Sequence, residues 1–187
     1  MRSHPVTTLI LTSAMIVAGA CTALLTRHPV AAATATLTDS AGGTVATASL
    51  WQEADGLVHV DVEALALSPG DHGIHFHSVG LCDPNTAPLF SSAGGHFNPL
   101  GKQHGLNNSA GPHAGDAPNL TVGADRRGKA SFTTDRITLT SGATSLFDAD
   151  GSALVIHALP DDQMSQPAGN SGARVACGVV RQVVQPK

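Results

Sequence analysis

Two histidines in the segment GIHFHSVGLC, residues 73–82, are spaced for metal binding. His75 and His77 flank one phenylalanine. In an extended strand, residues i and i+2 point to the same side, so both imidazoles project together while Ile74 and Phe76 face a core. Two imidazoles about 7 Å apart along a strand can close on one ion of copper, zinc, iron or nickel. A histidine-rich strand on the protein surface is the alternative interpretation.

A second set of metal-ligating residue types lies in the polar segment GGHFNPLGKQHGLNNSAGPHAGD. Its members are separated by seven, eight and two residues: His96, His104, His113 and Asp116. Three imidazoles and one carboxylate supply the four ligands of a closed tetrahedral zinc site. The short spacing between His113 and Asp116 lets one turn deliver both side chains. The sequence therefore predicts a zinc site in this segment.

One more histidine, His157, lies in the apolar segment ALVIHA. We expect it on the outer, surface side of its strand, beside His75 and His77. These three imidazoles and one ligand shared with the zinc site would complete a four-nitrogen copper site. A shared imidazole has to lose both ring protons, which requires a cation at each nitrogen.

Short strands are expected to position these ligands. Charged residues make up only 13% of the chain, whereas Gly (20 residues) and Pro (11 residues) are frequent. The segment GLVHVDVEAL alternates, with Val58, Val60 and Val62 on one face, which is typical of a half-buried antiparallel strand. Further predicted strands are ATATL, TVATASLWQ, NLTVG, KASFTTD, ALVIHA and VACGVVRQV, whereas SPGDHG is predicted as a turn. The pattern predicts an all-β fold, a Greek-key β-barrel or sandwich of about eight antiparallel strands.

Two long segments, residues 79–118 and 159–174, interrupt the strand pattern. Both are polar and rich in Gly and Pro. Loops of this length inside a domain are usually functional or disordered. We expect metal ligands and a disulfide bond to order them, so that they form the metal-binding and active-site loops.

The first 33 residues are typical of an export signal and tether, and the folded domain is expected over residues 34–187. A weakly basic start is followed by TLILTSAMIVAGAC, an apolar segment with small residues before Cys21. Three fates are open: lipidation of Cys21 at the lipobox-like AGAC, cleavage near Ala33 within VAAAT, or retention as a membrane anchor. Each predicts an exported protein of the cell envelope, periplasm or extracellular space. The net charge of −4 argues against nucleic-acid binding.

The cysteine count agrees with export. The chain has three cysteines, and Cys82 and Cys177 remain as a pair if Cys21 is lipidated or removed. We expect these two to form a disulfide bond in an oxidising compartment. Two unrelated buried cysteines are the alternative.

Six motifs occur in order along the chain: GIHFHSVG, GGHFNP, KQHG, GPHAGD, LVIHA and GNSGARVACGVV. Together they resemble the copper,zinc superoxide dismutases over about residues 34–184, and the place of Cys82 soon after His77 resembles the bacterial exported branch. The resemblance implies the sandwich-type fold, one copper and one zinc ion per subunit, superoxide as the substrate, and a monomer or homodimer.

The resemblance also implies a role for each motif residue. The copper ligands would be His75, His77, His96 and His157, and the zinc ligands would be His96, His104, His113 and Asp116. His96 would be the bridging imidazolate, Arg174 would meet the anion beside the copper, and Cys82 and Cys177 would form the disulfide bond. Asp161 would hydrogen-bond both His75 and His104 and fix their orientation. His72 would be structural.

The implied activity is the disproportionation of superoxide to dioxygen and hydrogen peroxide at the copper centre. Two rival interpretations are a non-enzymatic copper- or zinc-binding protein of the envelope and a zinc hydrolase. The presence of every copper position and of Arg174 argues against the first. A hydrolase needs an open zinc coordination position and a general base, whereas the four predicted zinc ligands close the site.

Overall fold

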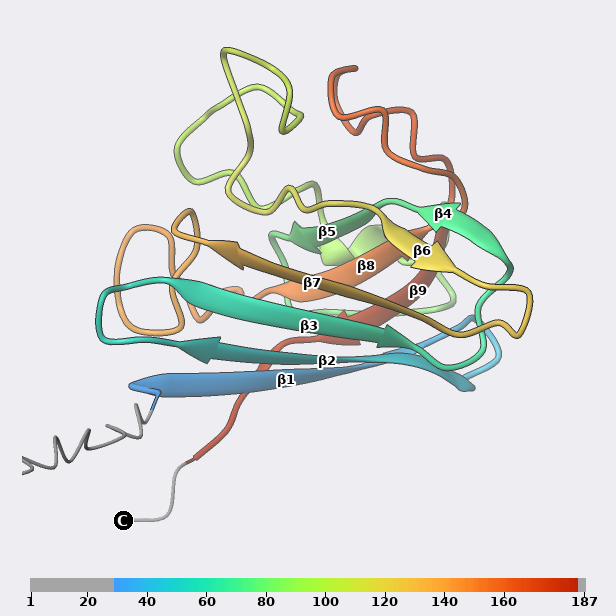
Figure 1. The fold of residues 1–187 in the computed structure, drawn as a ribbon, viewed down its shortest axis with the longest axis horizontal. Coiled ribbons are helices and arrows are strands. Elements are labelled where there is room, and N and C mark those ends of the chain that lie inside the picture. The colour runs from blue at the N-terminus through green and yellow to red at the C-terminus, as the bar shows by residue number, and fades with distance from the viewer. Residues whose placement is uncertain (1–28, 185–187) are drawn as a thin grey trace, which may run out of the picture.

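A computed structural model describes residues 29–184, and within this range the chain forms an all-β fold with no α-helix (Figure 1). The strands are β1 (Ala31–Thr38), β2 (Thr44–Gln52), β3 (Val58–Ala64), β4 (Gly70–His72), β5 (Ile74–His77), β6 (Leu120–Val122), β7 (Gly128–Thr134), β8 (Ala153–His157), β9 (Arg174–Val179) and β10 (Arg181–Gln182). A single 3-10 turn, η1 (Ser91–Ala93), lies between β5 and β6. The predicted all-β class is confirmed.

The strands pair into one sheet with the order β4-β6-β7-β3-β2-β1-β9-β8-β5, and β10 pairs with β1. Every pair of named strands is antiparallel. Only one residue separates β4 from β5, yet these strands lie at opposite ends of the order. The sheet must therefore curl until its two edges meet, which gives a nearly closed barrel with the crossover connections of a Greek key.

The core lies inside this barrel and follows from residue alternation. Val58, Val60 and Val62 of β3 are at most 1% exposed, whereas the residues between them point outward. β-branched side chains are favoured on a pleated surface of this kind, and full burial of one valine contributes about 1.5–3 kcal/mol. Val60 pairs with Leu50 of β2 on one side and with Phe132 of β7 on the other. The face predicted from the sequence is the face that is buried.

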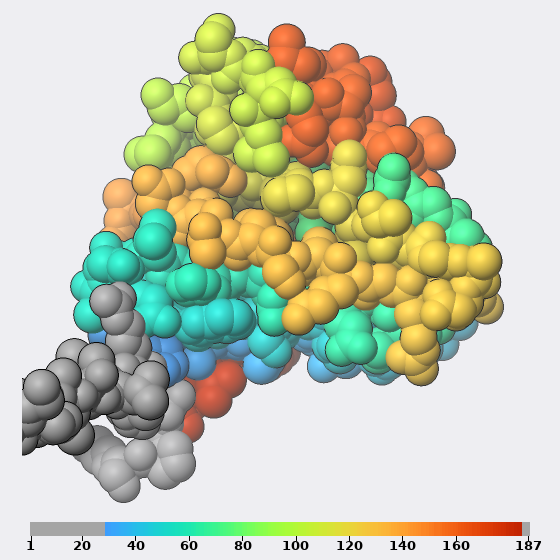
Figure 2. All heavy atoms as spheres, viewed as in Figure 1, coloured from blue at the N-terminus to red at the C-terminus, as the bar shows by residue number. Residues whose placement is uncertain are grey.

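The two predicted long loops are also present. One joins β5 to β6 and the other joins β8 to β9. Both rise from the same end of the barrel, above β5 and β8 (Figure 1), and they lie side by side in the space-filling view (Figure 2). The backbone N–H of His104 in the first loop donates to the side-chain oxygen of Gln166 in the second at 2.8 Å, so the loops are in direct contact.

A disulfide bond between Cys82 and Cys177 ties the first loop to β9, as predicted. The two Cα atoms lie 5.6 Å apart, and the sequence separation is 95 residues. The bond fastens the beginning of the β5–β6 loop to the barrel three residues after Arg174. The loop is thus held at a point close to the predicted site.

Two boundaries differ from the sequence prediction. Strand β1 begins at Ala31 rather than near Ala33 or Thr34, because Ala31 and Ala33 pair with Gln52 and Leu50 of β2. Small alanine side chains give a weak periodic signal, so pairing rather than hydrophobicity sets this start. The segment predicted as a turn also contains a short strand, β4, because its three residues pair with β6.

Cleavage near Ala33 would remove paired residues of β1, including Ala31, which is 7% exposed. Cys21 and the rest of the predicted export signal lie outside the described residues. No helix between residues 29 and 184 has the length and apolar character needed to cross a membrane.

Candidate metal centre

The predicted ligands come together because the β5–β6 loop returns twice to the edge of β5. Within β5, Phe76 accepts a backbone hydrogen bond from Phe97 at 2.8 Å and donates one to Gly115 at 2.9 Å. These contacts place His96 opposite His77 and Asp116 opposite His75 in bridge positions. The two loop segments therefore extend the sheet and carry their ligands to the ligands of β5.

Strand β8 supplies the remaining histidine from the other edge of β5. The pairing Ile74–Ile156 sets the register, and the backbone N–H of His157 donates to Gly73 at 2.9 Å. His157 lies beside His75 and His77 as expected, with ring centroids 4.9 Å and 5.8 Å from theirs, but it is only 4% exposed, so the expected surface exposure was wrong. Gly172 of the β8–β9 loop accepts from the ring at 3.1 Å, and the His96 ring of the β5–β6 loop lies 6.3 Å away. The surface-strand alternative for His75 and His77 is likewise wrong, since these residues are 0% and 1% exposed.

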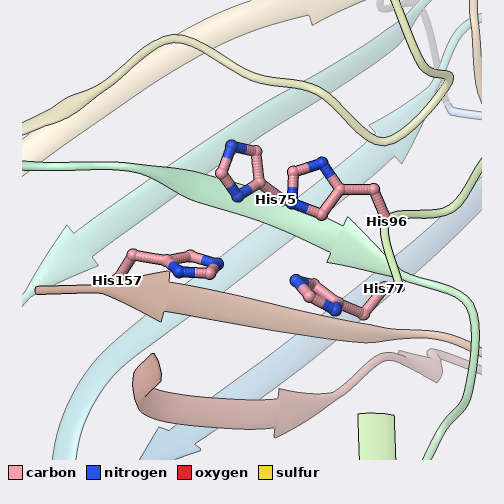
Figure 3. A group of neighbouring side chains, drawn as sticks. All are labelled: His75, His77, His96 and His157. Carbon is pink, nitrogen blue, oxygen red and sulfur yellow. The ribbon is translucent and has the colours of Figure 1, made fainter. Parts of the chain in front are cut away.

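Four imidazoles converge at this place, and Figure 3 shows their rings turned toward one another. One ligand atom from each member lies within 4.8 Å of those of the others: His75, His77, His96 and His157. Each of these rings has one buried nitrogen without a hydrogen-bond partner, namely Nδ1 of His75 and Nε2 of His77, His96 and His157. A buried polar atom without a partner is costly, so four such nitrogens gathered together are suited to binding a cation.

The other nitrogen of each of these rings has a hydrogen-bond acceptor. Nε2 of His75 lies 2.6 Å from the Asp161 carboxylate, Nδ1 of His77 lies 3.0 Å from the carbonyl oxygen of Gly94, and Nδ1 of His157 lies 3.1 Å from that of Gly172. An oxygen acceptor requires the proton on the nitrogen that faces it. These three rings therefore present a lone pair at the unpartnered nitrogen, which is the form that binds a metal ion.

Burial favours the neutral form of the same histidines. Desolvation lowers the pKa of His75 to about 3, although the hydrogen bond to Asp161 acts in the opposite direction. Desolvation also lowers the pKa of His157 to about 4, against the hydrogen bond to Gly172. For His77, desolvation and the nearby His96 hold the pKa well below its ordinary value. Neutral imidazole is the ligand that copper and zinc require.

A second group of ligand atoms surrounds Oδ1 of Asp116. Nδ1 of His96 and Nδ1 of His104 each lie 3.0 Å from this oxygen. Nδ1 of His113 lies 3.4 Å from it and 3.5 Å from Nδ1 of His96. A tetrahedral zinc ion with bonds of about 2.0–2.1 Å has ligand–ligand edges of about 3.3–3.4 Å. The four distances from 3.0 to 3.5 Å are therefore close to the edges of such a site.

His75 also lies close to His96, His104 and Asp116, so it is a competitor for the second group. Its Nε2 already meets Asp161 and its Nδ1 belongs to the first group. Neither nitrogen of His75 is therefore free for the second group, whereas Nδ1 of His113 lies 3.4 Å from Oδ1 of Asp116.

The Asp116 carboxylate is held as an anion. Its second oxygen, Oδ2, accepts the backbone N–H groups of Gly105 at 2.8 Å and His113 at 2.9 Å. Burial by itself would raise the pKa of Asp116, but hydrogen bonds from His104, His113 and His96 hold it far below its usual range. Arg136 donates to the backbone carbonyl of Asp116 at 2.8 Å, which fixes the main chain as well.

Asp161 connects the two groups. Its Oδ2 lies 2.6 Å from Nε2 of His75, and its Oδ1 lies 3.0 Å from Nε2 of His104. All three side chains are fully buried. Burial by itself would raise the pKa of Asp161, but hydrogen bonds from His104 and His75 hold it below its usual range. One carboxylate therefore orients a ring in each group.

Arg174 lies at the rim of the first group. Its guanidinium donates to the backbone carbonyls of Phe90 and Gly94, both in the β5–β6 loop. The positive charge of Arg174 contributes to the lowered pKa values of His77 and His157. His72 has a structural place instead. Its Nδ1 lies 2.6 Å from the backbone carbonyl oxygen of His157 in β8, and its Nε2 lies 2.9 Å from that of Ser68.

Several contributors to the site have no signal in the sequence. The carbonyl oxygens of Gly94 and Gly172 act through the main chain, which every residue possesses. Asn119 and Gln166 contact the backbone of Asp161 and His104, respectively, and lie outside the ligand motifs. Only the packing of the two loops identifies them.

Comparisons with known proteins point to one family. The sequence model for copper/zinc superoxide dismutase (SODC) matches residues 41–180. A relative from Aquifex aeolicus, superoxide dismutase (Cu-Zn) 1, is 44% identical over 149 residues, which cover 79% of this chain and 86% of the relative. Superoxide dismutase-like protein YojM of Bacillus subtilis is 45% identical over 123 residues, which cover 65% of this chain and 61% of YojM.

A comparison with solved structures agrees with the comparison of sequences. A double mutant of a SOD-like protein from Bacillus subtilis superposes with a TM-score of 0.72 at 40% sequence identity. The alignment covers 78% of this chain and 95% of that one.

Proposed function

Because the chain belongs to the copper/zinc superoxide dismutase family, we propose that it is an enzyme that disproportionates superoxide to dioxygen and hydrogen peroxide. The overall reaction converts two superoxide anions and two protons into one molecule of each product. We assign copper to the first group of imidazoles and zinc to the second. Copper, when bound, supplies the one-electron redox chemistry, and zinc, which has none, holds ligands in place.

The set of four unpartnered buried nitrogens is the observation that carries this proposal. They belong to His75, His77, His96 and His157. The tautomers of three of these rings are set by acceptors on their far sides, so the lone pairs face a common point. All-nitrogen coordination suits copper, whereas the carboxylate-containing group around Asp116 suits zinc.

We assign His96 as the ligand shared by the two metals. Its Nε2 is the buried atom without a partner in the copper group, and its Nδ1 lies 3.0 Å from Oδ1 of Asp116 in the zinc group. A ring with one nitrogen in each group can serve both ions as imidazolate. Nε2 of His96 is then also the atom that can hold a proton and release it to the reduced substrate, while Nδ1 stays in the zinc site.

Arg174 binds the substrate in this proposal. Its side chain is permanently charged, and its two backbone acceptors aim it at the rim of the copper group. Superoxide is a small anion, so a fixed guanidinium can attract it and orient it beside the copper ligands. The β8–β9 loop contains no lysine, so close-range attraction depends chiefly on this one residue.

A direct experiment separates this function from a non-enzymatic metal-binding protein and from a zinc hydrolase. The purified protein is loaded with copper and zinc, its metals are quantified, and superoxide consumption is measured by pulse radiolysis. One copper and one zinc per chain with fast consumption are expected. Zinc alone without superoxide consumption would favour the metal-binding protein, and ester or peptide hydrolysis would favour the hydrolase.

A pair of histidine variants sharpens that experiment. His157→Gln removes a proposed copper ligand and is expected to abolish both copper retention and activity while zinc remains bound. His59→Gln is the matched control, because His59 lies on the outer face of β3 and stacks on Trp51 with ring centroids 5.0 Å apart. Equal activity of the two variants would contradict the copper assignment.

We further propose that the protein is exported and lipidated at Cys21. The disulfide bond supports export, because such bonds persist in oxidising compartments. The start of β1 at Ala31 disfavours cleavage near Ala33, since that cut would remove residues paired with β2. Mass spectrometry of the mature N-terminus tests this assignment: a lipid-modified Cys21 as the first residue is expected, and a first residue near Thr34 or an uncleaved N-terminus would overturn it.

A further inference from the structure

The two long loops hold each other through two side-chain amides, one from each loop. Asn119, at the end of the β5–β6 loop, accepts the backbone N–H of Asp161 at 2.9 Å and donates to the backbone carbonyl of Asp161 at 2.9 Å. Gln166, in the β8–β9 loop, accepts the backbone N–H of His104 at 2.8 Å and donates to the backbone carbonyl of His104 at 3.0 Å. Each amide thus pairs with one residue of the opposite loop as a neighbouring strand would.

The two residues held in this way are also in contact with each other. Nε2 of His104 lies 3.0 Å from Oδ1 of Asp161, and both side chains are fully buried. Asn119 fixes the main chain of Asp161, and Gln166 fixes the main chain of His104. The buried contact is therefore positioned from both sides by side chains that hydrogen-bond to the main chain and to none of the ligand atoms.

The fit between the loops leaves little freedom for this contact. Gly169 has a φ of 61°, and a Cβ atom on it would overlap the Asp161 carboxylate and lie 2.7 Å from Nε2 of His104. Gly105, next to His104, lies so close to the backbone of Gln163 that a Cβ atom there would also overlap it. A small shift of one loop against the other would break the Asp161–His104 hydrogen bond.

We propose that Asn119 and Gln166 are positioning residues for the zinc site. By setting the main chain at Asp161 and His104, they orient the His104 ring so that Nδ1 faces Oδ1 of Asp116 at 3.0 Å. An amide is required at both positions, because the partner in each case presents one donor and one acceptor. This inference rests on the proposed zinc site and adds two residues that are not ligands.

The test compares zinc affinity across matched variants. Asn119→Ala and Gln166→Ala remove both hydrogen bonds, whereas Asn119→Asp and Gln166→Glu keep the acceptor and the size of the side chain but lose the donor. Asn107→Ala and Gln103→Ala are the controls, because both residues lie in the β5–β6 loop and, within residues 29–184, hydrogen-bond through their backbone N–H groups and not through their side chains. The metal-free protein is titrated with zinc ion in competition with a chromophoric chelator.

Loss of a group that orients a metal ligand lowers metal affinity by about 10- to 100-fold, so a weakening of this size is expected for the variants of Asn119 and Gln166. The controls should stay within about twofold of the original protein. Cobalt(II) bound at the same site provides a second measurement, because a rotated His104 changes the visible absorption spectrum. The Asp and Glu variants keep the test valid where an alanine variant does not fold.

Double variants distinguish positioning from general stabilisation. If Asn119 acts through Asp161, the zinc affinity of Asn119→Ala combined with Asp161→Asn should be close to that of Asp161→Asn alone. Additive losses, or a lower unfolding midpoint with unchanged zinc affinity and cobalt spectrum, would overturn the inference. Failure of the original protein to bind zinc would instead overturn the proposed function, and this inference with it.

Discussion

His77 and Arg174 donate to the same acceptor, the backbone carbonyl oxygen of Gly94. Nδ1 of His77 lies 3.0 Å from this oxygen, and the guanidinium of Arg174 reaches it from β9. The carbonyl oxygen of Gly94 therefore positions both the proposed copper ligand and the proposed substrate-binding cation. Gly94 has a φ of 74°, and a Cβ atom on it would lie 2.6 Å from Oγ of Ser78, so the position of this carbonyl depends on glycine.

Replacing Arg174 should separate charge from position. Arg174→Gln removes the charge and should lower kcat/KM for superoxide by about 10- to 100-fold, because a hydrogen bond to a charged group contributes about 1.5–3 kcal/mol. Arg174→Lys keeps the charge, but its ammonium group cannot donate to both carbonyls as the planar guanidinium does. Its rate should therefore lie between those of the original protein and the Arg174→Gln variant. Pulse radiolysis gives the rates, and copper content is the control. A lysine variant with the full original rate would contradict the importance of position.

Replacing Gly169 by alanine should break the hydrogen bonds through which Asp161 links the two metal groups. The added methyl group would overlap the Asp161 carboxylate, and the positive φ adds backbone strain. Asp161 should then move away from His75 and His104, with a loss of about 10- to 100-fold in the affinity for each metal. Competition titrations measure both affinities. Gly142→Ala is the control, since Gly142 also has a positive φ, 157°, but its Cβ atom would have only an ordinary contact with Thr138 at 3.6 Å. Unchanged metal binding by the Gly169 variant would contradict this role of Asp161.

The stability of the metal-free protein should decrease as the pH falls below about 6.5. Burial lowers the pKa of folded His75 to about 3 and that of folded His157 to about 4, below the ordinary histidine value of about 6.5. Between pH 6.5 and pH 5 the unfolded chain therefore binds protons that the folded protein excludes, and protonation favours unfolding. Each pKa unit corresponds to about 1.4 kcal/mol per group. Urea unfolding at several pH values measures the effect, and a midpoint independent of pH over this range would contradict it.

Zinc binding at neutral pH should release a proton from His104. Burial lowers the pKa of His104, but hydrogen bonds to Asp116 and Asp161 outweigh it and raise the pKa to about 9. The folded protein without metal therefore keeps a proton on each nitrogen of this ring at pH 7, and a zinc ion at Nδ1 must displace one. Calorimetry in buffers of different ionisation enthalpy should show about one additional proton released at pH 7 compared with pH 10. Equal release at both pH values would contradict the charged state of His104.

Removing the disulfide bond should affect both stability and the site. Replacing Cys82 and Cys177 together by alanine should lower the free energy of unfolding by about 4–5 kcal/mol for a closed loop of this length in the chain-entropy model. Phe90 and Gly94, the acceptors of Arg174, lie in the loop that the bond fastens, so activity should fall as well. Urea unfolding of the metal-loaded proteins measures the loss in free energy of unfolding, and the chemically reduced original protein is the comparison. A loss below about 1 kcal/mol would show that the loop is held by other contacts.

Local patterns in the sequence determined the strands and the ligand types. The alternation of Val58, Val60 and Val62 is a property of neighbouring residues, and so is the placement of His75 and His77 on one side of a strand. The fold class and the disulfide pair followed from such patterns and from cysteine arithmetic. The start of β1 did not, because Ala31 is held by pairing with Gln52 rather than by its own hydrophobicity.

Only the tertiary structure decided which nitrogen of each imidazole faces a metal group. The sequence names His77 and His157, but their tautomers depend on the carbonyl oxygens of Gly94 and Gly172, which lie 17 and 15 residues away. Asp161 and His75 are in contact across 86 residues of sequence, and Gln166 hydrogen-bonds to the backbone of His104 across 62. Residue types and their spacing can be read along the chain, whereas hydrogen-bond direction depends on which distant backbone groups folding brings within hydrogen-bonding distance of each ring.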